Sequence, residues 1–441
     1  MTPGPEELFA SISSGGGRED LYEGYRLLRD TAPVLLTSYG VLVLSGYDDC
    51  DAALRHRGLG KASGMQESRL ESMPDEQTRE TVARMRRMIL FTNPPDHTRL
   101  RRLVSSAFTS RHVDQLGPAI SRQADQLIEG LAGRPGEDFM TAVAQPLPVS
   151  VIAGLLGVPE PDRAGFATLV HDVTALIEPF VDTASLARAV SANAELSAYF
   201  AGLLAERRDR PADDLLSRLA ASRERDALDD TEMIATAILL FGAGFETTTN
   251  LLGNGLHALL AHPDQLALLR ERPHLIPGAV EEMLRYDSPV QLDSRSALEP
   301  SVIAGTELAP GKIVILLLGG ANRDPARFAD PDRFDICRDA GKFSHLAFAA
   351  GIHFCLGAQL ARLEARIVFA RLLARYPSIE LAGKPERRAE LSLHGFARLP
   401  LTCNLSRCSR AQTTFPPWSR RSQPHRRLHD ATTCRPRPFS V

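Results

Sequence analysis

Three absences narrow the class of protein before any motif is considered. The 441-residue chain contains no run of about 18 or more apolar residues, so no membrane-spanning helix is expected. The first residues, 1–7, show no basic region followed by an apolar stretch, so no secretion signal is expected. The six cysteines form no dense framework, which fits a reducing compartment better than a disulfide-rich secreted class. These absences predict a cytoplasmic protein that does not contact a membrane.

Charge is nearly balanced overall, at −3, but it is unevenly distributed. Residues 406–441 contain eight arginines, no lysine and one acidic residue, together with many serines and prolines. Such a composition cannot build a core, so we expect a disordered tail that the fold does not need. The order Cys403, Cys408, His425, His429 resembles that of a zinc finger, but the central gap is too long and lacks a hydrophobic pattern. We therefore favour disorder over zinc, and we expect no nucleic-acid partner.

The spacing of apolar residues predicts a mainly α, α+β architecture. Residues 93–286 are mostly helical in pattern. The longest stretch, 230–262, begins after Asp229, with Glu232 three residues further on, and ends before Pro263. An acidic residue followed three positions later by glutamate is a capping-box pattern, and proline cannot continue a helix. The sequence therefore predicts one long helix that crosses the domain.

Strand patterns are short and few. Residues 33–46 predict a hairpin, and short strands are expected again over 290–318, with a turn at Pro310-Gly311. Residues 1–19 are polar and Gly/Ser-rich and predict a loose lead-in. The candidate site residues lie far apart in the sequence and must meet at one ligand, so we expect residues 20–405 to form one domain.

One cysteine stands in a glycine-punctuated loop ahead of a predicted helix. Residues 348–357 read Phe-Ala-Ala-Gly-Ile-His-Phe-Cys-Leu-Gly, and helix formers follow from residue 358. A helix N-terminus favours a thiolate over a thiol, and Gly351 and Gly357 let backbone amides approach the sulfur of Cys355. A thiolate with no second cysteine nearby suits a single axial bond to haem iron. The alternative for a lone cysteine is a small buried hydrophobe.

This run resembles the haem-binding loop of the cytochrome P-450 superfamily, F-x-x-G-x-H-x-C-x-G. It matches that pattern at five positions: Phe348, Gly351, His353, Cys355 and Gly357. Ala349 stands where the family usually has glycine. The resemblance covers residues 20–405 and implies the cytochrome P-450 fold, a large helical domain with a long central helix and small β-sheets. It also implies haem b as the cofactor, with Cys355 as the axial ligand of the iron.

The predicted long helix contains the run Ala243-Gly244-Phe245-Glu246-Thr247-Thr248. Glycine costs ~1 kcal/mol in a helix interior, and threonine hydroxyls can bond to carbonyls one turn earlier, so we expect the helix to be weak or locally open here. A helix contact filled by small residues is the alternative. The run resembles the family's oxygen-activation motif, A/G-G-x-D/E-T. The resemblance implies Glu246 and Thr247 as the acid–alcohol pair that routes protons, with Ala243 and Gly244 beside the haem.

Glu282 and Arg285 are spaced to share one face of a predicted helix. Such a pair on a surface contributes little. The spacing resembles the family's E-x-x-R helix, which implies a scaffold role, with Arg333 as the third partner. These three residues would lock the cysteine loop and take no part in the chemistry.

Haem carries two propionates, so a haem protein needs cationic donors to pair with them. Arginine matches a carboxylate with two hydrogen bonds. The resemblance implies a set of four donors: His97, Arg101, Arg295 and His353. For His97 and Arg101, which are four residues apart, the alternative is a solvated basic helix face, since Arg99 and Arg102 flank them.

The resemblance implies a soluble, bacterial-type monooxygenase that inserts one atom of O2 into its substrate. No flavin- or NAD(P)-binding module is evident, so a separate ferredoxin and its NAD(P)H-dependent reductase are expected to supply electrons to a monomeric enzyme. Arg99, Arg102 and Arg362 are candidate contacts for this acidic partner. A peroxide-using or isomerising haem–thiolate enzyme is one alternative, and a non-enzymatic haem or small-molecule binder is another.

The substrate is expected to be a medium or large apolar molecule, such as a polyketide, macrolide, terpenoid or peptide-derived metabolite. The expected walls of its pocket are residues 58–90, 160–205 and 290–292. Their apolar side chains favour this class. The set includes Met65, Met73, Met85, Met88, Ile89, Leu169 and Phe180.

Overall fold

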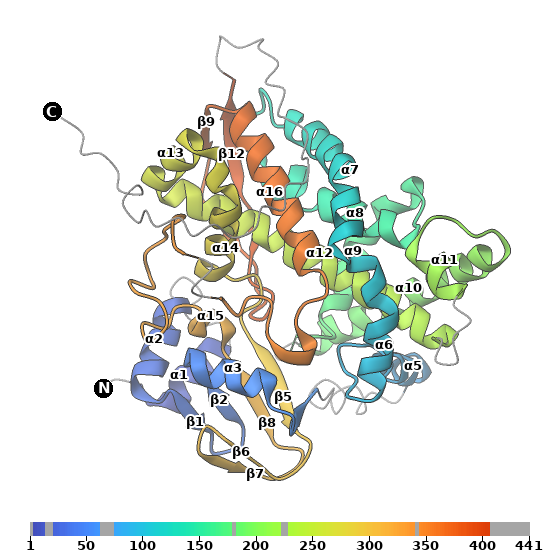
Figure 1. The fold of residues 1–441 in the computed structure, drawn as a ribbon, viewed down its shortest axis with the longest axis vertical. Helices are drawn as coiled ribbons and strands as arrows, with labels where there is room; N and C mark the ends of the chain where they lie inside the picture. The colour runs from blue at the N-terminus through green and yellow to red at the C-terminus, as the bar shows by residue number, and fades with distance from the viewer. Residues whose placement is uncertain are drawn as a thin grey trace, which may run out of the picture.

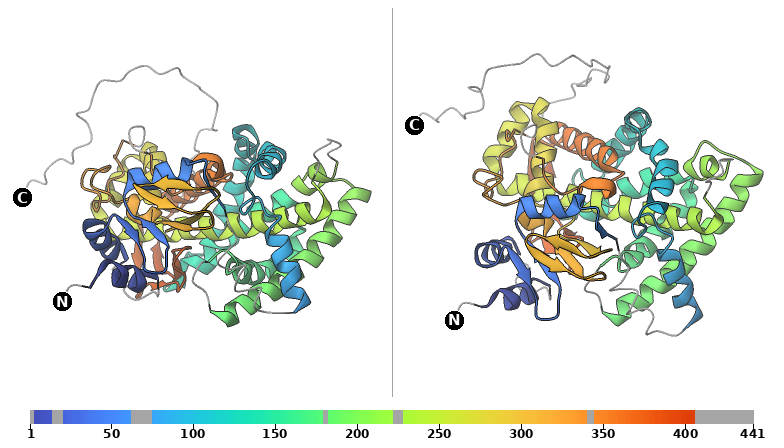
Figure 2. Two further views of the ribbon diagram at one scale, coloured as in Figure 1. Left: turned by 90° about the horizontal axis from the view of Figure 1, so that it is seen from below. Right: turned by 60° about the horizontal axis from the view of Figure 1, so that its bottom comes forward.

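The computed structural model describes residues 3–13, 21–61, 75–178, 182–221, 228–339 and 344–405. Helices make up the larger part of these residues. Strands β1, β2 and β5 to β8 lie with the N-terminal helices on one side, whereas β9 and β12 lie beside α13 and α16 (Figures 1 and 2). The tail, 406–441, lies outside the described residues, so its disorder stays a prediction. Within the described residues, no helix is both long and apolar enough to cross a membrane.

Helix α12 (Asp230–Ala261) runs through the centre of the helical part and packs against α8, α9, α10, α14 and α16 (Figure 1). Its start is a capping box: the Asp229 carboxylate accepts the N–H of Glu232, and the Glu232 carboxylate accepts the N–H of Asp229. Proline 263 opens the next helix, α13 (Pro263–Glu271). The predicted long helix is therefore confirmed to within a residue at its end.

The glycine- and threonine-rich run stays helical, which differs from the expected local opening. The Thr247 hydroxyl donates to the carbonyl of Ala243 at 2.7 Å, which is the expected bond to the preceding turn. Close packing explains why the helix persists: a Cβ on Gly244 would lie 3.4 Å from Ile152 of α8. Tertiary packing of this kind outweighs a weak local propensity.

The other long helices surround α12 or flank the sheet. Those in the helical part are α5 (Glu76–Met85), α6 (Asp96–Ser105), α7 (Ser110–Glu129), α8 (Pro146–Leu156), α9 (Arg163–Thr174), α10 (Thr183–Asp209), α11 (Leu215–Ala220), α14 (Ile276–Tyr286) and α16 (Ala358–Arg375). Those beside the sheet are α1 (Pro5–Ser13), α2 (Leu21–Thr31), α3 (Tyr47–Arg55) and the short α15 (Leu318–Ala321).

The largest sheet has the order β1-β2-β8-β5-β3, and all its neighbours are antiparallel except β2 and β8. Its strands are β1 (Val34–Leu36), β2 (Leu42–Leu44), β3 (Leu59–Gly60), β5 (Asp293–Ala297) and β8 (Ile313–Leu316). The pairing of β1 with β2 confirms the predicted hairpin. Strand β5 brings its first residues to the edge of the helical part, where the site lies.

Three smaller sheets complete the fold. They are the hairpin of β6 (Ser301–Ile303) with β7 (Thr306–Leu308), the pair β10 (Glu386–Arg387) with β11 (Phe396–Arg398), and the sheet of β4 (Glu137–Asp138), β12 (Pro400–Asn404) and β9 (Ser378–Leu381). The predicted turn at Pro310-Gly311 lies between β7 and β8, and Gly311 has a φ of 83°.

The prediction of a loose N-terminal lead-in was wrong for residues 5–13, which form α1. Leu8, Phe9 and Ile12 are buried in one cluster with Leu28 of α2 and Ile315 of β8. These three apolar residues are spaced for one helix face, a pattern that the neighbouring glycines and serines obscured. The N-terminal segment therefore contributes to the core.

Candidate active site

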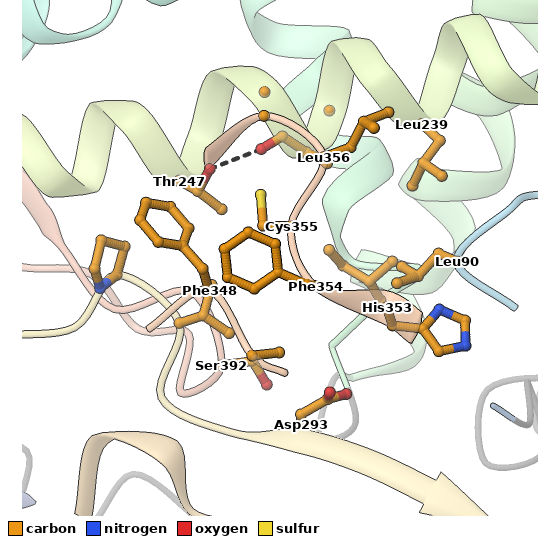
Figure 3. Close-up of a pocket in the computed structure, with 18 of the residues that line it drawn as sticks. Leu90, Leu239, Thr247, Asp293, Phe348, His353, Phe354, Cys355, Leu356 and Ser392 are labelled. Atoms are coloured by element: carbon orange, nitrogen blue, oxygen red, sulfur yellow. Dashed lines mark hydrogen bonds between the residues drawn. The ribbon is translucent and has the colours of Figure 1, made fainter. Parts of the chain in front are cut away.

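A cavity of about 590 Å³ lies between α12, strand β5 and the loop that precedes α16. Cys355 lines one side, and Thr247, Ala243 and Gly244 of α12 line another. Figure 3 shows Cys355 with Phe348 and Phe354 beside it and Thr247 across from it. Residues that lie more than 100 positions apart in the sequence thus meet at one cavity, as the motifs predicted.

The cysteine loop is shaped by two residues with positive φ. Gly351 has a φ of 70°, and a Cβ there would lie 2.5 Å from the carbonyl oxygen of Leu54, so only glycine fits. Ala349 has a φ of 54° and so adopts the conformation that the usual glycine of the family adopts freely. The N–H of Cys355 donates to the carbonyl of Phe348 at 3.0 Å and closes the loop.

We expect Ala349→Gly to stabilise the protein. The left-handed conformation costs an L-residue about 1–2 kcal/mol, and glycine removes this strain from the folded state. Glycine also makes the unfolded chain more flexible, which destabilises the protein by about 0.4–1 kcal/mol, so a net gain of about 0.5–1 kcal/mol in unfolding free energy remains. Thermal unfolding of the holoprotein measures the change. The neighbouring Ala350, with a φ of −148°, is the control, because glycine there should lower the melting temperature. A lower melting temperature for Ala349→Gly would contradict the strain.

The sequence argument that a helix start favours the thiolate holds only in part. Cys355 is exposed at the surface of the cavity. Enclosure by the surrounding loop raises the pKa of its thiol, and the N–H of Gly357 at the helix start and the charge of Arg101 lower it by less. A bound metal ion would deprotonate the thiol outright.

The four predicted propionate donors all line the cavity: His97 and Arg101 of α6, Arg295 of β5, and His353. His97 and His353 lie with their ring centroids 4.2 Å apart. Among the described residues, the buried Nε2 atoms of both histidines and Nη2 of Arg295 have no hydrogen-bond partner. Three unpartnered polar groups around one cavity fit a ligand that carries two carboxylates.

Arg101 also supports the loop, because its guanidinium donates to the carbonyl of Phe354 at 2.6 Å. Burial, followed by the charge of Arg101, lowers the pKa of His97 to about 4. His97 is therefore neutral at pH 7 and offers a single N–H. The solvated basic face considered for His97 is wrong, since its side chain is 2% exposed.

Glu246 does not line the cavity with Thr247. It is 1% exposed, and its carboxylate accepts a hydrogen bond from Arg388. The imidazole of His171, on α9, lies 3.9 Å from Oε2 of Glu246 and 3.2 Å from Nη1 of Arg388. Neither Arg388 nor His171 was found from the sequence, because both lie far from the motif in the chain.

A second acid holds the same C-terminal segment. Glu178, just after α9, accepts the backbone N–H groups of Ser392 at 3.2 Å and Leu393 at 2.9 Å. Burial raises the pKa of Glu178 to about 7. Ser392 and Leu393 line the cavity. Segment 388–393 is thus a wall of the cavity that is tied to α12 by Arg388 and to the end of α9 by Glu178.

Glu282 and Arg285 form a buried ion pair with two contacts of 2.7 and 2.8 Å. Arg285 also donates to the carbonyls of Asn322 at 2.9 Å and Pro331 at 2.8 Å. The Asn322 side chain accepts the N–H of Leu346 at 2.6 Å, at the approach to the cysteine loop. The pair is therefore linked to that loop, as the scaffold role requires.

The third partner differs from the expectation. Arg333 contributes only its carbonyl, which accepts from Arg285 at 3.2 Å, and its side chain is exposed. The guanidinium that contacts Glu282 belongs to Arg338, at 3.2 Å. Both arginines follow the same turn, so sequence spacing did not separate them.

Arg99 and Arg362, both expected to face an acidic partner, are engaged within the protein. Arg99 makes two hydrogen bonds to Glu232, the capping residue of α12. Arg362 pairs with Glu281 at 2.7 and 2.8 Å and lies 4.4 Å from the ring centroid of Phe348, so it supports the cysteine loop. Arg102 is exposed on α6.

The expected pocket walls are present in part. The cavity is lined by Ile89, Leu90, Ile177, Val290 and Leu292 from those segments, and by Leu239, Leu240 and Leu393, which were not expected. Met85 and Met88 are buried in the core instead, and Leu169 packs against it. Met65, Met73 and Phe180 lie outside the described residues.

Comparison with known proteins agrees with this geometry. The sequence profile of the family described as Cytochrome P450 matches residues 30–406. The chain is a cytochrome P450. Enzymes of this family use haem b with a cysteine thiolate as the axial ligand, so the protein is a haem-dependent monooxygenase.

Similar proteins include a cytochrome P450 monooxygenase, PikC, of Streptomyces venezuelae, 42% identical over 83% of this P450 and 86% of the relative. The vitamin D(3) 25-hydroxylase of Pseudonocardia autotrophica is 40% identical over 89% of this chain and 98% of the relative. Among solved structures, P450BioI in complex with a hexadec-9Z-enoic acid-ligated acyl carrier protein has a TM-score of 0.82 and 36% identity, covering 88% of this P450 and 100% of that chain.

Proposed function

We propose that this P450 hydroxylates or epoxidises a medium or large apolar molecule, with Cys355 as the axial ligand of haem b. The observation that carries the proposal is the single cavity in which Cys355 and Thr247 meet the unpartnered donors of His97, Arg295 and His353. When bound there, the haem supplies the activation of O2. Arg101, Arg295 and the two histidines would hold its propionates.

The side chains of α12 then manage protons. The Thr247 hydroxyl lines the cavity and donates its own hydrogen to the Ala243 carbonyl, so its oxygen is left as an acceptor that would hold and orient a proton-carrying group, such as a water, at this face of the cavity. Glu246 lies behind it. The solvent-exposed His171, whose pKa is raised by its contact with Glu246 against the effect of burial, links that carboxylate to bulk water.

The substrate class follows from the walls. Leucine, isoleucine and valine side chains dominate them, and a cavity of this kind favours a large apolar molecule. Two of the relatives are named for such ligands: vitamin D3 and a fatty acid on a carrier protein. We therefore infer a polyketide, macrolide or terpenoid substrate, with electrons supplied by a separate ferredoxin and its reductase. Arg102, which is exposed on α6, stays a candidate contact for that ferredoxin.

A panel of macrolides, sterols and terpenoids tests this proposal. We expect at least one compound to shift the spin state of the ferric enzyme and to yield a product labelled from 18O2 when ferredoxin, reductase and NAD(P)H are present. Product formed with peroxide alone would favour the peroxygenase alternative. A spin shift without product under full turnover would favour the non-enzymatic binder.

We expect Thr247→Ala to keep haem and substrate binding but to uncouple turnover. Without the hydroxyl, the proton donor would lose the acceptor that holds and orients it at this face of the cavity, and reducing equivalents would drain into peroxide, so product per NAD(P)H should fall by about tenfold or more. Product and peroxide are measured against NAD(P)H consumed. The control is Thr249→Ala, because the Thr249 hydroxyl bonds to the Ala144 carbonyl at 3.1 Å and does not line the cavity. An unchanged ratio of product to NAD(P)H consumed in Thr247→Ala would contradict this role of Thr247.

A further inference from the structure

Lys61 and Asp293 form a buried ion pair on the wall of the cavity (Figure 3 shows Asp293). The backbone of Lys61, just after β3, is held on both sides by Asn93: its N–H donates to Oδ1 at 2.8 Å, and its carbonyl accepts from Nδ2 at 2.9 Å. Buried ion pairs cost desolvation energy and stabilise a fold only weakly. A rigidly placed pair inside a cavity therefore calls for a chemical reason.

Asp293 lies between two cations. Its Oδ2 accepts from Nη1 of Arg295 at 2.6 Å, and its Oδ1 accepts from the ammonium of Lys61 and from the N–H of Ser294 at 2.8 Å. Burial raises the pKa of Asp293, but Arg295 and Lys61 lower it by more, so the group stays ionised. The positive charge of Arg295 is thus already paired with the negative charge of Asp293 before any ligand binds.

A charge balance shows what Lys61 adds. In the described part of the cavity lining, the cations are Lys61, Arg101 and Arg295, and the carboxylic acids are Asp293 and Glu364. A thiolate at Cys355 would be offset by the net positive charge of the ferric haem core, so it leaves this balance unchanged. Burial raises the pKa of Glu364 to about 8, so this carboxyl is neutral at pH 7. Two propionates and Asp293 make three anions, and the two arginines alone would leave one of them uncompensated. Burial lowers the pKa of Lys61 to about 8, which still leaves a third cation at pH 7.

We propose that Lys61 is a further member of the propionate-binding set and that, with Asp293, it balances the charge around the haem. The proposal rests on haem ligation by Cys355. One-electron reduction of the haem adds a negative charge, so the ammonium of Lys61 favours the reduced form and the carboxylate of Asp293 opposes it. The pair therefore sets the reduction potential as well as the retention of the cofactor.

The test is the reduction potential of the substrate-free holoenzyme, measured by spectroelectrochemical titration. A unit charge in a partly buried site changes a one-electron equilibrium by about tenfold, equivalent to about 59 mV. Lys61→Met should lower the potential by about this amount, and Asp293→Asn should raise it. The double variant and Lys61→Arg should stay near the wild-type value. Haem transfer to apomyoglobin should be faster in Lys61→Met.

The control is Lys312→Met, which removes an exposed lysine from the turn before β8 and should leave the potential unchanged. Unchanged potentials in both Lys61→Met and Asp293→Asn would overturn the proposal. A double variant whose reduction potential is as low as that of Lys61→Met would also overturn it, because the opposite effects of Lys61 and Asp293 would then not cancel. If Lys61→Met fails to fold, Asp293→Asn and Lys61→Arg decide the matter. Failure of the proposed ligation appears separately, as a wild-type protein without a thiolate spectrum.

Discussion

Cys355→Ala should abolish the absorption band that is diagnostic of thiolate ligation in the ferrous–carbonyl complex. The structure places this thiol on the wall of the cavity, and the loop around it is closed by its own backbone N–H. Without the sulfur, no other described cysteine reaches the cavity: Cys50 lies in the sheet cluster, Cys337 packs against the main core and Cys403 lies in β12. Activity with O2 should fall to the background.

The control for this variant is Cys50→Ala. Cys50 is fully buried, and burial holds the pKa of its thiol well above the ordinary value, so it is a small hydrophobe without a ligand role. It should keep the thiolate band at some cost in stability. A normal band in Cys355→Ala would mean that another residue ligates the iron.

Arg285→Ala and Glu282→Ala should give little or no haem-loaded soluble protein. Both side chains are about 2% exposed, and Arg285 binds three carbonyls besides its partner. Removing one partner of a buried pair leaves a buried charge, at about 3–5 kcal/mol. This is a large share of a total stability of about 5–15 kcal/mol. Haem content and melting temperature measure the loss.

The chain offers a matched control with the same spacing of three residues. Glu23 and Arg26 of α2 form an exposed pair that solvent screens, so Glu23→Ala should leave haem content and melting temperature close to the wild-type values. Arg285→Lys should resemble Arg285→Ala, because a lysine keeps the charge but cannot reach the carboxylate and the carbonyls together. A wild-type melting temperature for Arg285→Ala would show that the pair stabilises the fold no more than a surface contact does.

The sequence predicted those parts of the site that depend on local pattern. The capping box located the start of α12, and the spacing around Cys355 located the loop, because both rest on residues within one turn of each other. The four residues predicted to bind the propionates all line one cavity. Spacing alone could not have brought β5 beside α6.

The contacts that the sequence did not predict join residues far apart in the chain. Arg388 and Glu246 are separated by 142 positions and Lys61 and Asp293 by 232, so neither pair leaves a periodic signal. The choice of Arg338 over Arg333 depends on which side chain the turn directs inward. Helix α1 was missed for a different reason: its three apolar residues do share one helix face, but the neighbouring glycines and serines obscured that pattern.

The hydrogen bond between Arg388 and Glu246 connects the cavity wall to the carboxylate behind Thr247. Ser392 and Leu393 line the cavity, so a bound substrate would contact them, and Arg388 of the same segment donates to Glu246. A substrate bulky enough to push this segment outward would weaken that hydrogen bond and let the Glu246 carboxylate rotate. Substrate size and proton supply would then depend on the same segment, so that a poorly fitting substrate would uncouple turnover even when every motif residue is intact.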